Sequence, residues 1–221
     1  MAEILGEYGR WSSLAPDDSA IVVYDSMWHT TEDMALEIVE AFIECGVPTR
    51  LFDLKANHIS DIMTDLLSAK FVAVGSPTLN NGMMPTVAAF LCYLKGLSPK
   101  AGWEGRVGIP FGSYGWGTNG PDEVAAALEA CGFDLPLGTL SHQWIEDEDH
   151  LARLQETIKQ GVAAKGAVSE GVAFFAFALA PVAARAARAS DAISRPAART
   201  RSSRCLCIVW NTRRTVSVWA S

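Results

Sequence analysis

The chain has 221 residues, with 18 Lys and Arg, 25 Asp and Glu and 49% apolar residues, which suits one globular domain of ordinary composition. The net charge of −7 is unevenly divided. Residues 1–166 carry 10 basic and 23 acidic side chains, whereas residues 167–221 carry eight Arg and only two acidic side chains. Binding of a nucleic-acid backbone needs a basic face, so we expect no nucleic-acid partner for the acidic segment.

The five cysteines include no CxxC pair, which disfavours a disulfide framework or a zinc site and favours a reducing cytoplasm. The first 20 residues lack a basic segment followed by an apolar one, so no secretory signal is visible. An apolar run at 171–184 contains Pro181 and is shorter than the roughly 20 residues of a spanning helix. We therefore expect a cytoplasmic protein that does not cross a membrane.

Short apolar runs alternate with segments of helical period, the pattern of a parallel sheet wrapped by helices. The expected strands are 20–24, 49–53, 70–75 and 105–111, with a weaker one at 133–140. Among the helices, the first follows a cap at Thr30 or Thr31, the third begins at Pro85, the fourth begins at Pro121 and the last spans 146–164. This succession predicts one doubly wound α/β domain over residues 19–166.

The two ends differ from this pattern. Residues 1–18 show no periodicity, and we interpret them as a linker or the remnant of a preceding domain. Residues 167–221 are rich in Ala, Arg and Ser, and we interpret them as a poorly ordered tail. Two alternatives remain open, a basic arm for RNA or anionic lipid and the product of a shifted reading frame.

Polar and aromatic residues gather after the first, third and fourth expected strands, in the segments 25–31, 76–82 and 112–118. In an open parallel sheet, ligands bind beyond the carboxyl ends of the strands, at the point where the strand order reverses. The three segments therefore predict one ligand site at a single edge of the sheet.

The first segment offers the hydroxyls of Ser26, Thr30 and Thr31 together with backbone N–H groups at a helix start, which suits a phosphate. It contains no Lys or Arg and so differs from a P-loop, which favours a monophosphate held by hydroxyls and amides. The alternative is that the two threonines are helix caps and nothing more.

The second and third segments carry what a flat heteroaromatic ring needs. Thr78, Asn80 and Asn81 supply hydrogen-bonding edges, and Tyr114 and Trp116 supply aromatic faces. Trp28 could add a third face. The alternative is that these aromatic rings pack only against their own loop.

The motifs DSMWHTT (25–31), SPTLNNGMMPT (76–86) and FGSYGWG (111–117), with FDLK (52–55) and FLCYLKGLSPK (90–100), resemble the flavodoxin-like domain of flavodiiron proteins over residues 18–164. These A-type flavoproteins include rubredoxin:oxygen and nitric oxide oxidoreductases. The resemblance implies a flavodoxin-like three-layer α/β/α fold, a five-stranded parallel sheet in the order 2-1-3-4-5, and FMN at the switch point. The cofactor contacts that it implies are Ser26, Met27, Trp28, His29, Thr30 and Thr31 at the phosphate, and Pro77, Thr78, Leu79, Asn80, Asn81, Ser113, Tyr114, Gly115, Trp116 and Gly117 around the ring.

The resemblance also implies a function. FMN would pass electrons from a redox partner, rubredoxin-like or a reductase, to a diiron domain or subunit that reduces O2 or NO, and a homodimer is left open. This chain has four histidines and no HxExD cluster, so alone it is expected not to reduce O2 or NO at iron. The acidic run at 146–149, followed by His150, is interpreted as a helix start and not as a metal site.

Charge adds one expectation. With no cation in the phosphate segment and an excess of 13 negative charges over residues 1–166, the bound flavin should have a low reduction potential, and a basic redox partner should be attracted.

The competing interpretation is an FMN-dependent NAD(P)H or quinone reductase of the same fold. A receiver domain is disfavoured by Ser76 at the end of the third strand, a serine hydrolase by Phe111 in place of the first Gly of GxSxG, and a non-binding remnant is the last alternative.

Overall fold

The structure is a computed structural model that describes residues 4–6, 8–9, 15–97, 103, 105–145 and 147–165. The tail at 167–221, with its apolar run, lies outside the described residues. The chain divides into two units, residues 1–170 and 171–221, and the domain discussed below belongs to the first. No helix in the described part of the chain is both long enough and apolar enough to cross a membrane.

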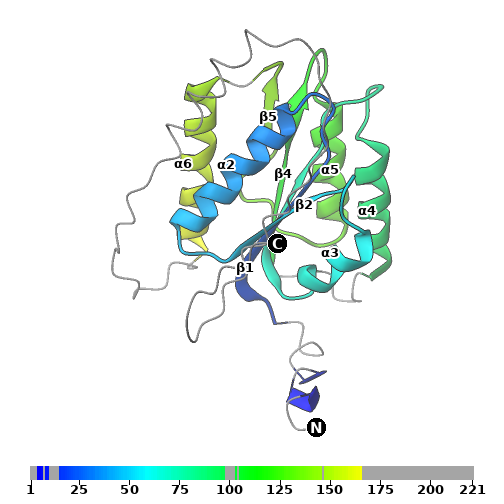
Figure 1. Ribbon diagram of the computed structural model, residues 1–221, viewed down its shortest axis with the longest axis vertical. Helices are drawn as coiled ribbons and strands as arrows, with labels where there is room; N and C mark the ends of the chain where they lie inside the picture. The colour runs from blue at the N-terminus through cyan, green and yellow to red at the C-terminus, as the bar shows by residue number, and fades with distance from the viewer. Residues whose placement is uncertain are drawn as a thin grey trace, which may run out of the picture. The chain divides into compact units, whose positions relative to one another are not determined.

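Five parallel strands form a single sheet in the described domain, in the order β2-β1-β3-β4-β5 (Figure 1). They are β1 (Asp17–Tyr24), β2 (Thr49–Asp53), β3 (Ala69–Gly75), β4 (Val107–Tyr114) and β5 (Leu140–Gln143). The order confirms the flavodoxin-like fold expected from the sequence. Because the chain moves outward from β1 to β2 and then returns to β3 on the other side, the order reverses between β1 and β3.

Helices cover both faces of the sheet. The described helices are α2 (Thr30–Glu44), α3 (Ile59–Leu66), α4 (Pro85–Leu97), α5 (Asn119–Ala130) and α6 (Glu148–Ala164). Figure 1 shows α2 and α6 on one face and α3, α4 and α5 on the other. Successive strand residues alternate between these layers: Ala20 and Val22 pack under α2 and α6, and Ile21 and Val23 pack under the opposite layer.

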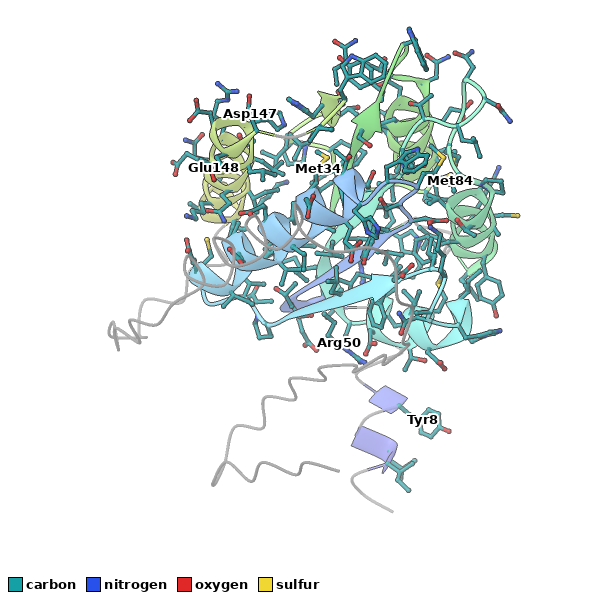
Figure 2. All side chains as sticks on the ribbon, turned by 45° about the horizontal axis from the view of Figure 1, so that its top comes forward. Tyr8, Met34, Arg50, Met84, Asp147 and Glu148 are labelled. Atoms are coloured by element: carbon teal, nitrogen blue, oxygen red, sulfur yellow. The ribbon has the colours of Figure 1, made fainter. Side chains whose placement is uncertain are left out.

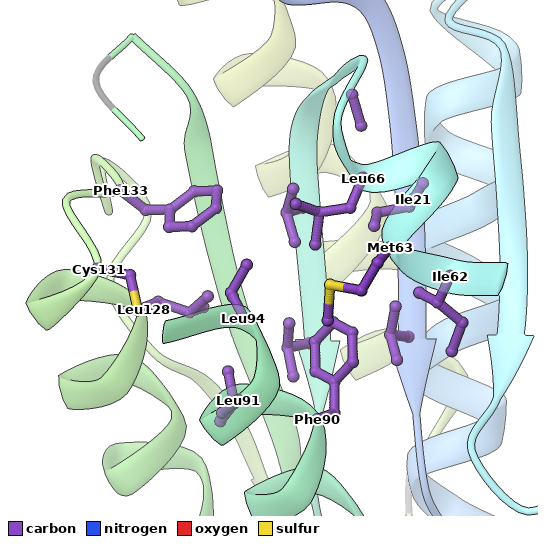
Figure 3. Close-up of a cluster of buried hydrophobic side chains, with 14 of the residues drawn as sticks. Ile21, Ile62, Met63, Leu66, Phe90, Leu91, Leu94, Leu128, Cys131 and Phe133 are labelled. Carbon is purple, nitrogen blue, oxygen red and sulfur yellow. The ribbon is translucent and has the colours of Figure 1, made fainter. Parts of the chain in front are cut away.

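The second layer is shown in Figure 3, where Met63 and Leu66 of α3 and Phe90 and Leu94 of α4 face the sheet. All four side chains are buried. Burial of a side chain of this size stabilises a fold by about 1.5–3 kcal/mol, so the two layers fix the sheet and, with it, the loops at its edge.

Three strand expectations need correction. One is the strand expected at 105–111, because β4 is Val107–Tyr114. β1 begins at Asp17, which pairs with Ala69, so the strand takes in residues that we had assigned to a linker. The strand expected at 133–140 is wrong except for its last residue, because β5 is Leu140–Gln143. Pro136 has no N–H to give to a ladder and Gly138 has a φ of 63°, which together break the apolar pattern before β5.

Three helix starts also differ. α5 begins at Asn119, two residues before Pro121, and α6 begins at Glu148 behind an Asp147 cap. The cap of α2 is His29, not Thr30 or Thr31. The start of α4 at Pro85 is confirmed.

Candidate functional site

The three segments singled out in the sequence meet at the carboxyl edge of the sheet, and Ser113 joins them. Its hydroxyl lies 3.1 Å from the hydroxyl of Thr31, and its carbonyl accepts a 3.0 Å hydrogen bond from the backbone N–H of Thr78. Figure 2 labels Met34, early in α2, and Met84, two residues after the second segment. The structure therefore brings the residues predicted from three distant parts of the chain into one place.

The first segment ends in the N-terminus of α2, whose first N–H groups have no intrahelical partner. His29 precedes the helix with a φ of 70° and gives no side-chain cap, and its ring instead contacts Glu32 at 2.6 Å. Ser26 is buried, and its hydroxyl has no hydrogen-bond partner among the described residues. Unsatisfied N–H groups at a helix N-terminus, and an unpartnered buried hydroxyl four residues before that helix, are donors of the kind that a phosphate accepts from.

A charged group lies next to this segment. It belongs to Lys55, the last residue of the FDLK motif, whose contact with the first segment was not expected from the sequence. Lys55, just after β2, forms a 2.8 Å ion pair with Asp25 and also donates to the carbonyl of Ser26. Asp25 is fully buried and in addition accepts from the N–H of Ser26 at 2.7 Å and from the hydroxyl of Thr86. The segment itself holds no cation, as the sequence showed, but a cation from another loop adjoins it.

The second segment is a tight turn in which Leu79 and Gly82 exchange backbone hydrogen bonds of 2.8 and 3.0 Å. The two residues between them, Asn80 and Asn81, have φ values of 48° and 66°, the left-handed pair typical of a type I′ turn. A glutamate of α5, Glu123, accepts from the N–H of Met83 at 2.8 Å and holds the end of the turn.

Close backbone packing holds the second segment against β4 and α5. A Cβ on Gly112 would lie 1.9 Å from the carbonyl oxygen of Ser76, and one on Gly120 would lie 2.8 Å from that of Pro77. The N–H of Gly120 also donates to the hydroxyl of Thr78 at 3.1 Å. Glycine is required at position 112, where side-chain atoms have no room beside the neighbouring backbone.

The third segment differs from expectation at its start, because β4 continues to Tyr114 and so includes Ser113. Trp116, beyond the strand, is 94% exposed, and Trp28 in the first segment is 85% exposed. For Trp116 the alternative that the ring packs only against its own loop is therefore not what the structure shows, whereas Tyr114, which the same alternative named, is half-buried. Large exposed apolar rings at the edge of a sheet are typical of a binding surface.

A fourth segment was not anticipated. Trp144 follows β5, has a φ of 65° and places its ring against Trp116, with centroids 5.0 Å apart. Its neighbour Gln143 donates a 2.8 Å hydrogen bond to the carbonyl of Gly115. A single Trp after a weak strand gave no signal of this role in the sequence, since the contact depends on β4 and β5 being neighbours.

Left-handed backbone gathers at this edge. Among the described residues, the non-glycine residues with positive φ are His29, Asn80, Asn81 and Trp144, and all four lie in the segments just described. For Asn80 and Asn81 this conformation is ordinary in a type I′ turn, whereas for the bulky Trp144 it is strained, at a cost of about 1–3 kcal/mol.

Electrostatics at the edge favour a neutral Tyr24, the last residue of β1. Burial, followed by the nearby carboxylates of Glu32, Asp53 and Asp25, raises the pKa of the Tyr24 hydroxyl well above its usual value. No group of three or more His, Cys, Asp or Glu side chains within the described ranges is arranged to hold a metal ion.

A doubly wound parallel sheet with a hydroxyl-rich helix start at its switch point defines a class of α/β domains that bind phosphorylated cofactors at this edge. Residues 22–166 match the family model of flavodoxin, and the chain belongs to the flavodoxin family. Proteins of this family bind FMN, which confirms the cofactor expected from the sequence.

The resemblance to flavodiiron proteins is also confirmed. The chain is 36% identical over 162 residues to rubredoxin-oxygen oxidoreductase of Megalodesulfovibrio gigas, covering 72% of this chain and 39% of the relative. It is 35% identical over 156 residues to a nitric oxide reductase of Moorella thermoacetica, covering 69% and 38%. The chain thus spans less than half the length of these curated relatives.

The solved structures agree. The flavodiiron protein of Giardia intestinalis superposes with a TM-score of 0.66 at 30% identity, covering 72% of this chain and 39% of that one. A flavodoxin from the domain Archaea superposes with a TM-score of 0.55 at 23% identity, and the match takes in 98% of it, which shows a shared fold.

Proposed function

We propose that the three segments bind FMN and that the domain transfers electrons through it within an assembly like those of the flavodiiron proteins. The observation that carries this proposal is the buried hydroxyl of Ser26, which has no partner among the described residues and belongs to the residue four positions before the start of α2. A phosphate oxygen would satisfy this hydroxyl, and the helix dipole would favour its charge.

The proposed phosphate contacts are the backbone N–H groups and hydroxyls of residues 26–31. The backbone of His29 has a left-handed conformation and its ring contacts Glu32, so this residue would offer the phosphate its backbone N–H and not its side chain. Thr31 already reaches Ser113, so its hydroxyl links the phosphate segment to the ring segment. Thr30 stands at the first position of α2, where its N–H is one of the orphan donors.

The proposed ring contacts are residues 77–81 on one side and 113–117 on the other. The turn at Leu79–Gly82 and the glycines packed beside it hold the first side, while Trp116 is available as an aromatic face for the second. Bound FMN supplies one-electron and two-electron redox chemistry, and the residues of this chain bind it, orient it and limit its contact with water.

The proposed partners follow from the relatives' names and from charge. A rubredoxin-like protein or a reductase would donate electrons, and a diiron domain or subunit would accept them, with a homodimer as one possible arrangement. The acidic excess over residues 1–166 would attract a basic partner, with an effect that falls off over about 8–10 Å at physiological salt.

The phosphate half of this proposal can be tested by comparing FMN with riboflavin, which lacks the phosphate. Ser26→Ala should weaken FMN binding about tenfold, because one hydrogen bond to a charged group is lost, and should leave riboflavin binding unchanged. Ser60→Ala, an exposed serine on α3, is the matched control. Equal loss for both flavins would contradict a phosphate contact at Ser26.

The competing function, an FMN-dependent NAD(P)H or quinone reductase, is tested by adding NADPH to the FMN-loaded chain. Oxidation of NADPH without any partner protein would favour it over partner-dependent electron transfer.

A further inference from the structure

The end of β5 is fastened to the third segment by two hydrogen bonds. The backbone N–H of Trp144 donates to the carbonyl of Tyr114 at 2.8 Å, and the side-chain amide of Gln143 donates to the carbonyl of Gly115, also at 2.8 Å. The carbonyls of the two residues before Trp116 therefore both accept hydrogen bonds from the end of β5 and the residue after it.

The ring of Trp144 adds a further contact between β5 and the third segment. It meets the ring of Trp116 edge to face, with centroids 5.0 Å apart and planes at 82°. It also covers the backbone of Gly115, where a Cβ would lie 3.3 Å from the indole. Edge-to-face pairs are the preferred arrangement of aromatic side chains, so the contact favours one placement of Trp116.

This arrangement has an energetic cost that packing alone does not explain. Trp144 adopts a φ of 65°, which is unfavourable for a bulky side chain, and yet the residue is 52% exposed. Its partner, Trp116, is 94% exposed. A strained residue that supports an almost fully exposed aromatic ring gains little from burial, and strain of this kind is typical of functional sites.

We propose that Trp144 is a positioning residue for the cofactor: through its edge-to-face contact it fixes the ring of Trp116 in the geometry that receives the flavin ring. The inference rests on the proposed function, because it assigns a role at the same site. Trp144 acts through Trp116 and need not touch the flavin itself.

The test uses the full chain with four single variants, Trp144→Ala, Trp144→Leu, Trp144→Phe and Ile145→Ala. FMN affinity is measured by quenching of flavin fluorescence, the ring environment by the visible circular dichroism of bound FMN, and the midpoint potential by anaerobic reductive titration. Ile145 is the adjacent apolar residue, 84% exposed, and serves as the matched control.

Trp144→Ala and Trp144→Leu should weaken FMN binding about three- to tenfold, change the visible circular dichroism and shift the midpoint potential. Trp144→Phe, which keeps an aromatic edge, should bind within about twofold of wild type, and Ile145→Ala should match wild type. In a Trp116→Ala background the further loss from Trp144→Leu should shrink to less than about twofold, since the residue acts through Trp116.

The inference is overturned if Trp144→Leu keeps wild-type affinity, dichroism and potential, or if its effect is undiminished in the Trp116→Ala background. Wild-type chain that takes up no FMN would instead overturn the proposed function. Leucine retains an apolar side chain at this position, so the test does not depend on whether the alanine variant folds.

Discussion

At the scale of single residues, Asp25 and Lys55 explain how a carboxylate can lie beside a proposed phosphate site. Asp25 is fully buried, and its charge is met by the ammonium of Lys55, the N–H of Ser26 and the hydroxyl of Thr86. Lys55 also holds the carbonyl of Ser26. Lys55 therefore holds the backbone of Ser26, the first of the proposed phosphate contacts, and offsets the negative charge of the adjacent Asp25.

Removing the cation from this pair should destabilise the domain. We expect Lys55→Met to lower the free energy of unfolding by about 1–3 kcal/mol, because a buried carboxylate loses a charged partner. Urea unfolding measures the change. Lys165→Met, which breaks the exposed ion pair with Asp134, is the control and should cost less than about 1 kcal/mol.

The double variant Lys55→Met/Asp25→Asn sharpens this test. Since it removes both charges, it should be more stable than Lys55→Met alone. Equal stability of Lys55→Met and Lys165→Met would show that the pair does not matter to the fold.

These residues also show what could not be predicted from the sequence. The first segment was identified because hydroxyls at a helix start have a recognisable local pattern. Lys55 lies 29 positions from Ser26 and reaches it only because β1 and β2 are neighbours. Trp144 reaches Trp116 only because β4 and β5 are neighbours. Contacts made by tertiary pairing leave no local signal.

At the scale of elements, the second segment can lie where it does because β4 and α5 present glycines to it. Gly112 leaves no room for a Cβ next to the carbonyl of Ser76, and Gly120 leaves little next to that of Pro77. Neighbouring side chains can move aside, but a backbone carbonyl in this position cannot do so without displacing the turn that follows β3.

We expect Gly112→Ala to destabilise the domain by at least about 1–3 kcal/mol, the usual effect of forcing extra atoms into a packed region, and to weaken FMN binding. Gly96→Ala is the matched control. This glycine is exposed in α4, has open space at its Cβ position and should tolerate or gain from alanine, which favours helix by about 1 kcal/mol. Urea unfolding measures the free energy of unfolding of both variants. Equal values for Gly112→Ala and Gly96→Ala would contradict the packing argument.

Beside the sheet edge, β5 and α6 bring two histidines together, with ring centroids 4.0 Å apart. Burial, then His142 of β5 and Arg153 of α6, lower the pKa of His150, against an opposing effect of Asp147. In the unfolded chain the residue regains its ordinary pKa of about 6.5. The unfolded state therefore binds the proton more readily than the folded state. The free energy of unfolding is accordingly highest above about pH 6.5, where His150 is neutral in both states, and it falls as the pH drops below that value.

We accordingly expect the free energy of unfolding to fall as the pH is lowered from about 7.5 to 5.5, and His150→Gln to make that fall shallower. Urea unfolding at several pH values provides the measurement. An unchanged pH dependence in His150→Gln would rule out this histidine as a contributor.

The elements themselves were largely predictable. Strands buried on both faces are apolar runs, and four of the five lie where those runs are. The fifth was misplaced because Phe133 is buried in a connection and not in a strand, and a buried connection and a strand look alike when only hydrophobicity is read. The cap of α2 was misassigned because the cap residue is His29, whose backbone is left-handed and whose side chain makes no cap. The hydroxyls at Thr30 and Thr31 had suggested threonine there.

At the scale of the whole molecule, the described domain is a flavodoxin-family domain that corresponds to part of the longer curated relatives. Its strand order places the first and second segments at the reversal between β1 and β3, and β4 and β5 carry the third segment and Trp144.

The central claim is that this chain holds FMN at that edge, and the visible spectrum of the purified chain tests it most directly. Bound flavin should give absorbance maxima near about 375 and 450 nm, because the cofactor carries the chromophore, and they should persist through desalting. A colourless protein that stays colourless after incubation with excess FMN and desalting would contradict the claim.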